Sequence, residues 1–559
     1  MVGEEYADLI IFYLNNPKRL ERYTDAIIRY INEAFAVVHV PVTQIDSKTV
    51  NTFGYSAIPK LFGLCSEISL EASGVDKIRN LPNFSLSGEG ILIGIIDTGI
   101  DYSNQVFINE DGRTKIASLW DQTIETGSSP YDTQFGTEYK AEQINQALTS
   151  DTPLQIVPSI DENGHGTMMA AVAAGNANRE VDFSGVATAS ELVIVKLKPA
   201  KQYLRNFYFI PDDVLCYQEN HIMWGVQYCL QMAKDLDRPI VICLGIGSSQ
   251  GAHDGRSPLS RFLSIIGDFP RTAVVTPAGN EGNLGRHYYN TINPTAGYNT
   301  VELRVGENDK GFSMEIWGNS PGIYSISLLS PDNEFIPRIP PSLRVNRVVS
   351  FIFSNTIIYI DYLMTESETG DQLILLRFSN AATGIWNFNV YGQGNLPLGF
   401  HIWLPMGDMI SDDTYFIQPD IYTTVVDPGT AVVPITITAY NPIGGTLFVN
   451  ASRGYTRSNT VKPTLAAPGV NYIAPNNNKE FINYTGTGVA AAHTAGIVAL
   501  ILEWGVIRGN KPNIDTVEIK NYLIRGAKTN PNLEYPNRDL GYGMIDIYNV
   551  FNVLRSDFS

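Results

Sequence analysis

Apolar residues are arranged in two different patterns along the chain, and each pattern predicts its own kind of β-sheet. In the first pattern, short and nearly continuous apolar runs are separated by polar segments and by a helical stretch at about His221–Leu236. Such runs are typical of strands buried on both faces of a parallel sheet with helices in the connections, and they predict an α/β domain. The runs are Ile91–Ile96, Glu191–Lys196, Pro239–Gly245 and Thr272–Thr276.

The second pattern occupies the stretch from about Tyr298 to Gln418, where apolar and polar residues alternate in short segments between Gly, Pro, Asn and Asp. It predicts an inserted antiparallel β region, most simply a sandwich or a jelly roll. The α/β pattern resumes near Val461 and ends with a helix that begins near residue 488 and another at about Ile514–Arg525. The clearest alternating triplets are Val301/Leu303/Val305, Tyr324/Ile326/Leu328 and Trp386/Phe388/Val390.

Residues 1 to about 85 form a small α+β unit of their own. Ala7–Tyr13 and Phe35–Val42 are predicted strands, and an amphipathic helix is predicted between them over Arg19–Glu33. Gly74–Gly90 has the composition of a connection, and the polar stretch 103–160 that of a surface loop with a short helix near Ala141–Leu148. The predicted domains are an N-terminal unit over 1–85, an α/β domain over 86–297 and 431–559, and a β-rich insertion over 298–430.

Charge, cysteine content and the N-terminus narrow the class of protein. A formal net charge of −18 over 559 residues argues against nucleic acid and anionic membranes as partners, because both would repel the chain. Four scattered cysteines do not make a disulfide framework. The N-terminus is acidic where a signal peptide is basic, and no window approaches the roughly 18 to 20 apolar residues of a membrane span. We therefore expect cytosolic synthesis and no membrane-spanning segment.

Three polar residues occupy positions where functional groups gather in α/β folds. Asp97 ends an apolar strand run, and Asn280 follows another in a turn, where its amide could donate to a developing oxyanion. His165 lies between two glycines at the entrance to a helix of Met and Ala, which leaves its imidazole unobstructed. Each also has a structural interpretation: a turn aspartate, a buried histidine and a turn asparagine.

A fourth position is defined by what it lacks. The stretch YTGTGVAAAHTAG runs from a Gly-Thr-Gly turn straight into a helix of small residues. A residue at the start of such a helix has an unpaired N–H near the positive end of the helix dipole, which suits an anionic intermediate. The residue there is Gly488, which carries no nucleophile.

Taken in order, these motifs resemble the subtilisin-type serine proteases. DTGID resembles the aspartate motif, GHGT the histidine motif, AGNEG the oxyanion asparagine and TGTGVAAAHTAG the serine motif. The resemblance implies that Asp97 orients His165, that His165 is the general base, and that Asn280 and the N–H of residue 488 form the oxyanion hole. Leu244 and Gly245 would belong to the substrate-cleft strand. Ala466-Ala467-Pro468-Gly469 resembles the loop before the nucleophile.

The departure from the family lies at the nucleophile, where glycine replaces serine. Loss of that serine costs subtilisin on the order of 10⁶ in kcat.

No cofactor is expected. Calcium is common among subtilases, but the sequence has no D-x-D-x-D-G loop, so no required metal is predicted.

A short N-terminal unit and a β-rich insertion between the asparagine and serine motifs resemble the Csp germination subtilases of spore-forming Clostridia, and the missing serine resembles their pseudoproteases of the CspC or CspA type. This implies a role in germination signalling in the coat and cortex region of the spore. The implied partners are a sister Csp protease, the precursor of a cortex hydrolase and a small-molecule germinant. The N-terminal unit would be an uncleaved prodomain whose C-terminal end lies in the cleft.

Two other interpretations stay open. The chain could be an active endopeptidase whose serine was changed to glycine in the laboratory, or a structural or chaperoning protein with the β insertion as its interaction module. Intact Asp97, His165 and Asn280 fit recent or engineered loss of activity, although a buried Asp–His pair can also persist for structural reasons. Ordinary surface roles are expected for Lys196, Lys198, Glu315 and the Asp427 region. Arg453 is expected to be a solvated loop residue, although the family resemblance also suggests contacts with a partner or signal there.

Overall fold

The centre of the protein is an eight-stranded sheet with strand order β26-β25-β13-β11-β6-β9-β7-β8. The computed structural model describes residues 3–24, 26–69, 86–131, 133–341, 344–394 and 398–556. All neighbouring strands of this sheet are parallel except β7 and β8. The predicted parallel sheet is confirmed. The strands are β6 (Leu92–Asp97), β7 (Ile116–Asp121), β8 (Thr137–Lys140), β9 (Glu191–Lys196), β11 (Ile240–Leu244), β13 (Thr272–Pro277), β25 (Ile435–Tyr440) and β26 (Leu465–Pro468).

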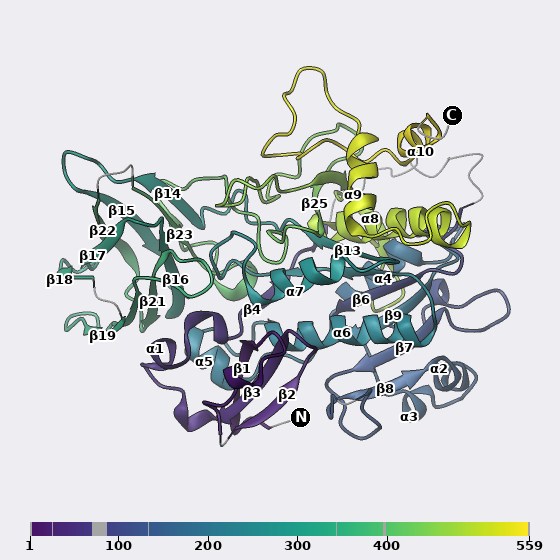
Figure 1. Cartoon of the computed structure of the whole chain (residues 1–559), viewed down its shortest axis with the longest axis horizontal. Helices are drawn as coiled ribbons and strands as arrows, with labels where there is room; N and C mark the ends of the chain where they lie inside the picture. Colours follow the sequence, from purple (N-terminus) through teal and green to yellow (C-terminus); the bar gives the residue numbers. More distant parts are fainter. Residues whose placement is uncertain are drawn as a thin grey trace.

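Helices cover both faces of this sheet, and the strand residues alternate between the two cores. Ile93 and Ile95 of β6 pack with helices α4 and α8, whereas Leu92 and Ile96 pack with α6 and α7 on the other face. Figure 1 shows this layered arrangement, with α8 and α6 on opposite sides of the strands. The helices of the central domain, of which α5 packs instead against the N-terminal unit and the insertion, are α2 (Ala141–Leu148), α3 (Pro153–Ile156), α4 (His165–Ala174), α5 (Gln202–Tyr208), α6 (Glu219–Asp235), α7 (Pro258–Gly267), α8 (Thr487–Leu502), α9 (Thr516–Arg525) and α10 (Ile547–Ser556).

Two antiparallel sheets form the β insertion, which lies beside the central sheet in Figure 1. Their strand orders are β14-β23-β16-β21-β20-β19 and β18-β17-β22-β15-β24, and side chains from both sheets share one buried core. All three predicted alternating triplets belong to the second sheet, on the paired strands β15, β17 and β22. The strands are β14 (His287–Thr291), β15 (Tyr298–Val305), β16 (Gly311–Gly318), β17 (Ile323–Leu329), β18 (Phe335–Ile339), β19 (Arg344–Ser350), β20 (Ile357–Leu363), β21 (Gln372–Ser379), β22 (Gly384–Gln393), β23 (Gly399–Trp403) and β24 (Tyr415–Phe416).

The N-terminal unit contains an antiparallel sheet in the order β1-β3-β2 and a short helix, α1 (Thr49–Phe53). The predicted strands are confirmed as β1 (Tyr6–Phe12) and β3 (Phe35–Pro41). The predicted helix over Arg19–Glu33 is wrong, because strand β2 (Ile27–Tyr30) pairs with β3 there. The apolar spacing of this short stretch fits a helix, but its β-branched and aromatic residues complete the sheet, so pairing decides the conformation.

Other sequence predictions are also corrected. The stretch 103–160 contains the buried strand β7 and is therefore not only a surface loop, because Leu119 and Trp120 belong to the core. Lys196, Glu315 and Asp427 are buried and not on the surface. Most of the predicted connection Gly74–Gly90 lies outside the described residues.

One helical stretch is long and apolar enough to cross a membrane by composition, contrary to the expectation from the sequence. It is Thr487–Ile507, with a mean hydropathy of 1.6. Its best window is 78% buried inside the protein, where α8 packs against the central sheet. Burial in the core therefore accounts for its apolar composition.

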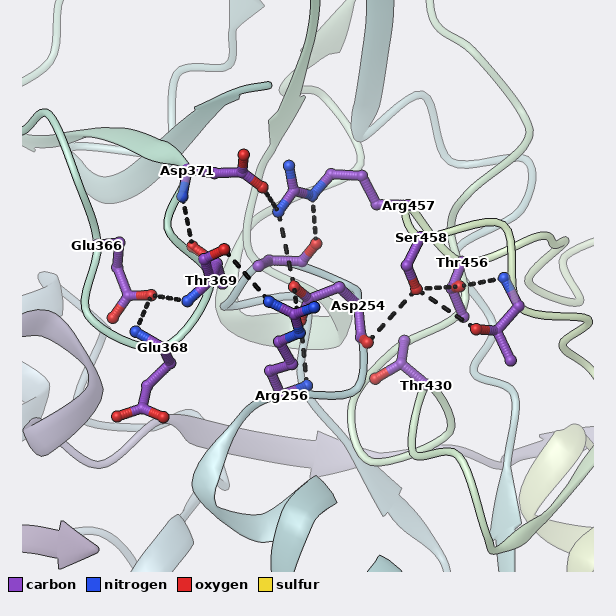
Figure 2. Close-up of polar contacts among 12 residues, drawn as sticks. Asp254, Arg256, Glu366, Glu368, Thr369, Asp371, Thr430, Thr456, Arg457 and Ser458 are labelled. Atoms are coloured by element: carbon purple, nitrogen blue, oxygen red, sulfur yellow. Dashed lines mark hydrogen bonds and ion pairs between the residues drawn. The ribbon is translucent and has the colours of Figure 1, made fainter. Parts of the chain in front are cut away.

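Polar contacts join the insertion to the central domain. Arg457, which is almost fully buried, forms ion pairs with Asp371 of the insertion at 2.7 Å and with Asp254 of the central domain at 3.7 Å. Figure 2 shows this arginine between the two carboxylates, with Arg256 donating to the carbonyl of Thr369 nearby. These contacts attach the insertion to the rim of the central domain.

Candidate active site

Asp97 and His165 meet at the carboxyl end of β6, an inner strand of the central sheet. Asp97 is the last residue of β6, and His165 is the first residue of α4. Asp97 Oδ1 and His165 Nδ1 are 2.7 Å apart, and the side chains are 0% and 4% exposed. Nε2 of His165 and Oδ2 of Asp97 have no hydrogen-bond partner among the described residues. A histidine held this way at Nδ1 presents Nε2 as the atom that could accept a proton.

The two glycines beside His165 allow close packing of the backbone. Gly164 has φ of 87°, in the left-handed region that favours glycine. A Cβ on Gly166 would lie 2.2 Å from the carbonyl oxygen of Gly99. These glycines let helix α4 begin directly against the turn after Asp97.

Asp161 holds the start of α4 in place, and sequence reasoning missed it. Its carboxylate accepts hydrogen bonds from the backbone N–H groups of Gly164 and Thr167 at 2.9 Å each. The hydroxyls of Thr98 and Thr167 donate to the same carboxylate at 2.8 and 2.7 Å. An acidic residue a few positions before a helix start is the sequence signal that could have identified it.

Asn280 is oriented by the residue before Gly488. The N–H and hydroxyl of Thr487 both donate to Asn280 Oδ1 at 3.1 Å. Since Oδ1 is the acceptor, Nδ2 is the group of Asn280 that can donate to a negatively charged oxygen in the cleft. Asn280 is 6% exposed.

Gly488 lies in the first turn of helix α8, beside a segment of the N-terminal unit. Its φ lies outside the left-handed region, so the backbone accommodates a side chain. A Cβ at this position would lie 2.4 Å from Ser66 Oγ and 3.2 Å from the carbonyl oxygen of Cys65. The space next to Gly488 is therefore filled by Ser66.

The segment from residue 61 to 69 crosses the site as an extended chain. Strand β4 (Leu61–Leu64) pairs with β12 (Ile246–Gly247), and strand β5 (Glu67–Ser69) pairs with β28 (Phe481–Thr485). Between the two strands, Cys65 N–H donates to the carbonyl of Gly245 and Gly488 N–H donates to the carbonyl of Cys65, both at 2.9 Å. The carbonyl of Cys65 therefore occupies the position expected for the carbonyl of a bound substrate.

Gly245 and Leu244 lie differently with respect to the cleft. A Cβ on Gly245 would lie 2.4 Å from Asp97 Oδ2 and 2.8 Å from His165 Cε1, so only glycine fits there. Leu244 is fully buried in the core on the face of α6 and α7. The carbonyl of Gly245 accepts a hydrogen bond from Cys65 of the N-terminal segment. The side chain of Leu244 points away from that segment, into the core beneath the sheet.

Cys65 lies beside Gly488, and its thiol is in an environment that disfavours a nucleophile. Burial raises the pKa of its thiol well above the usual value, and the negative charges of Glu281 and Asp97 raise it further. The reactive form of cysteine is the thiolate, which this environment disfavours. In the part of the chain that the structure describes, no group of three or more His, Cys, Asp or Glu side chains could hold a metal ion.

Comparison with known proteins connects these features to a family. The model of the Subtilase family matches residues 88–301 and 417–543, with the β insertion between the two matched parts. The structure of the Clostridium perfringens CspB protease is similar, with a TM-score of 0.75, 29% sequence identity, 85% of this chain covered and 95% of that chain covered.

Curated relatives are more distant. Subtilisin-like protease SBT3.6 of Arabidopsis thaliana is 24% identical over 460 residues, which cover 74% of this chain and 56% of that protein. Pyrolysin of Pyrococcus furiosus is 22% identical over 551 residues, which cover 86% of this chain and 36% of that protein. The chain thus spans about half the length, or less, of these curated relatives. Because the family model matches both parts of the central domain, the chain belongs to the subtilase family of serine proteases.

Proposed function

We propose that this protein is a catalytically inactive subtilase that acts by binding. The observation that carries the proposal is Gly488, which stands where the family's motif has the nucleophilic serine. Acyl transfer in this family needs a hydroxyl that attacks the substrate carbonyl, and glycine supplies none. Asn280 and the N–H of Gly488 can still bind and orient a carbonyl, but no covalent bond to the protein forms.

The contacts around Gly488 support this proposal. Ser66 Oγ lies where a side chain of residue 488 would begin, and the imidazole of His165 has no partner at Nε2 among the described residues. In an active subtilase the nucleophile itself would occupy this space and bond to the histidine. The N-terminal unit is proposed to be an uncleaved prodomain whose end occupies the cleft.

The biological setting is proposed from the similarity to the CspB protease of Clostridium perfringens. We propose that the protein takes part in spore germination signalling and regulates activation of a cortex-hydrolase precursor. Its partners would then be a sister Csp protease, that precursor and a small-molecule germinant. The spore would be its location.

Intact mass tests the loss of catalysis. We expect the full-length chain to stay uncut. A Gly488→Ser chain that also carries Ser66→Ala, which removes the crowding hydroxyl, tests whether a serine restores cleavage after Cys65. Gly488→Ala with Ser66→Ala is the matched control, since it adds a side chain without a hydroxyl. Cleavage of the unaltered chain by itself, or hydrolysis of a casein substrate by it, would contradict the proposal.

A second candidate is an active endopeptidase whose serine was replaced. The intact Asp97–His165 pair and the orientation of Asn280 favour it. If the serine chain cleaves itself quickly while the control does not, only the nucleophile is missing. The codon for residue 488 in the natural gene then distinguishes a replaced serine from a natural glycine.

A further inference from the structure

Cys65 and Ser66 each accept one hydrogen bond from the first turn of helix α8. The helix begins after Gly486, which has no side chain that could cap it. Ser66 Oγ accepts a hydrogen bond from the N–H of Val489 at 3.1 Å, and the carbonyl of Cys65 accepts from the N–H of Gly488. The first turn of a helix leaves such N–H groups without partners inside the helix. The N-terminal segment therefore caps the central helix of the domain.

This capping depends on the glycine at position 488. The nearest atom to a Cβ at that position would be Ser66 Oγ at 2.4 Å, which is too close for two non-bonded atoms. The next nearest atoms are the carbonyl oxygen and carbon of Cys65 at 3.2 and 3.4 Å. The hydroxyl of Ser66 is thus the group of the segment that a side chain at residue 488 would displace first, and it holds its present position because residue 488 is glycine.

The residue before Ser66 is also restricted in size. Cys65 is completely buried in a small apolar cluster with Met406 and Val426. Its Sγ lies 3.2 Å from where a Cβ on Gly247 would be. A side chain much larger than cysteine does not fit this position without moving its neighbours.

We propose that Gly488 creates a binding site for the hydroxyl of Ser66, so that the cleft selects a chain segment with a small residue followed by serine. The occupant is the segment Leu61–Ser66 of this same chain. This inference rests on the proposed function, because it treats the missing nucleophile as space for a ligand. It adds a specificity rule, since a competing peptide would need the same pair of residues to displace the segment.

A double-mutant cycle on residues 66 and 488 tests the proposal. The four full-length chains are the unaltered one, Ser66→Ala, Gly488→Ala and the double variant, and the readout is amide hydrogen exchange in residues 61–66 and 486–490. Ser66→Ala removes one acceptor, so exchange of the Val489 amide should rise roughly 2- to 10-fold. Gly488→Ala should accelerate exchange further, because the new methyl group displaces the hydroxyl.

The sign of the coupling is the decisive result. In the chain that already carries Gly488→Ala, the further change Ser66→Ala removes the clash, so it should slow exchange of the segment instead of accelerating it. The same acceleration by Ser66→Ala in both backgrounds would overturn the proposal. Ser56→Ala is the matched control, since Ser56 lies in the same unit with its hydroxyl 3.2 Å from that of Ser367, and it should show no coupling to residue 488.

Two single variants test whether the cleft admits only a small residue at position 65. They also keep the proposal falsifiable if Gly488→Ala does not fold. Cys65→Leu should accelerate exchange of residues 61–66 by more than about tenfold, whereas Cys65→Ala should change it little. Equal effects of the two would overturn the rule. Hydrolysis of casein by the unaltered chain would refute only the proposed function, because the exchange measurements require no turnover.

Discussion

The two helices that begin at the cleft, α4 and α8, differ in what holds their first turns. The start of α4 carries His165, and the buried carboxylate of Asp161 accepts hydrogen bonds from the N–H groups of Gly164 and Thr167. The start of α8 carries Gly488, and two residues of the N-terminal unit accept from its N–H groups. Ser66 Oγ accepts from Val489, and the carbonyl of Cys65 accepts from Gly488. His165 and Asp97 are hydrogen-bonded to each other in a buried site, so loss of either residue leaves the other without its polar partner. At residue 488, glycine leaves Nε2 of His165 without a hydrogen-bond partner among the described residues, and the hydroxyl of Ser66 fills the space beside it.

The largest expected effect concerns Asp97 in a chain with a restored nucleophile. In Gly488→Ser/Ser66→Ala, the further change Asp97→Asn should lower the rate of self-cleavage about 10⁴-fold, because the histidine loses the carboxylate that orients and stabilises it. Intact mass against time measures both rates. If the rate is unchanged, the pair at α4 has only a structural role.

Replacing Asp161 should destabilise the start of helix α4. Asp161→Ala removes the acceptor of four buried hydrogen bonds and should lower the free energy of unfolding by about 3 to 5 kcal/mol. Urea denaturation followed by fluorescence measures the change. Asp151→Ala, at an exposed position in the same part of the chain, is the control and should have little effect. A loss below about 1 kcal/mol would show that α4 does not depend on this carboxylate.

Asp8 links the N-terminal unit to the central domain by an ion pair with Lys201 at 2.8 Å, and it also contacts His39 of its own unit at 2.7 Å. Burial raises the pKa of Asp8, but the hydrogen bond from His39 and the charge of Lys201 outweigh this and hold the pKa well below its usual value. The stabilisation is therefore complete above the unfolded pKa near 3.8 and is lost as the pH falls below it.

Asp8→Asn should accordingly cost about 2 to 3 kcal/mol at pH 7 and should weaken the dependence of stability on pH between about 4 and 2. Thermal unfolding of both chains across this pH range measures the effect. If stability falls with pH equally in both chains, Asp8 does not cause the loss of stability in acid. Loosening of the unit should also expose the first turn of α8, but not that of α4.

The smallest effect is expected at α7, a helix that carries its own cap. Ser257 Oγ accepts a hydrogen bond from the N–H of Ser260. Ser257→Ala should cost about 1 kcal/mol without changing amide exchange at residues 486–490. Faster exchange there would mean that capping at α7 and at α8 is coupled.

Much of the fold was predictable from local pattern. Apolar runs identified β6, β9, β11 and β13, because strands buried on both faces need apolar residues at every position. The pattern failed at β2, where a helical spacing of isoleucines was overridden by pairing with β3. It also failed at β7, because the surrounding polar loop obscured its short apolar run.

The sequence by itself determined the family motifs, the positions of Asp97, His165 and Asn280, and the absence of a nucleophile at residue 488. These depend on short stretches of chain whose residue types have few other uses in such an order. Only the tertiary structure decided that Cys65 and Ser66 reach the cleft, that Asp161 caps α4, and that Glu315 and Asp427 are buried. Those facts arise from contacts between residues far apart along the chain, and no local pattern of residues specifies which distant partner fills a given space.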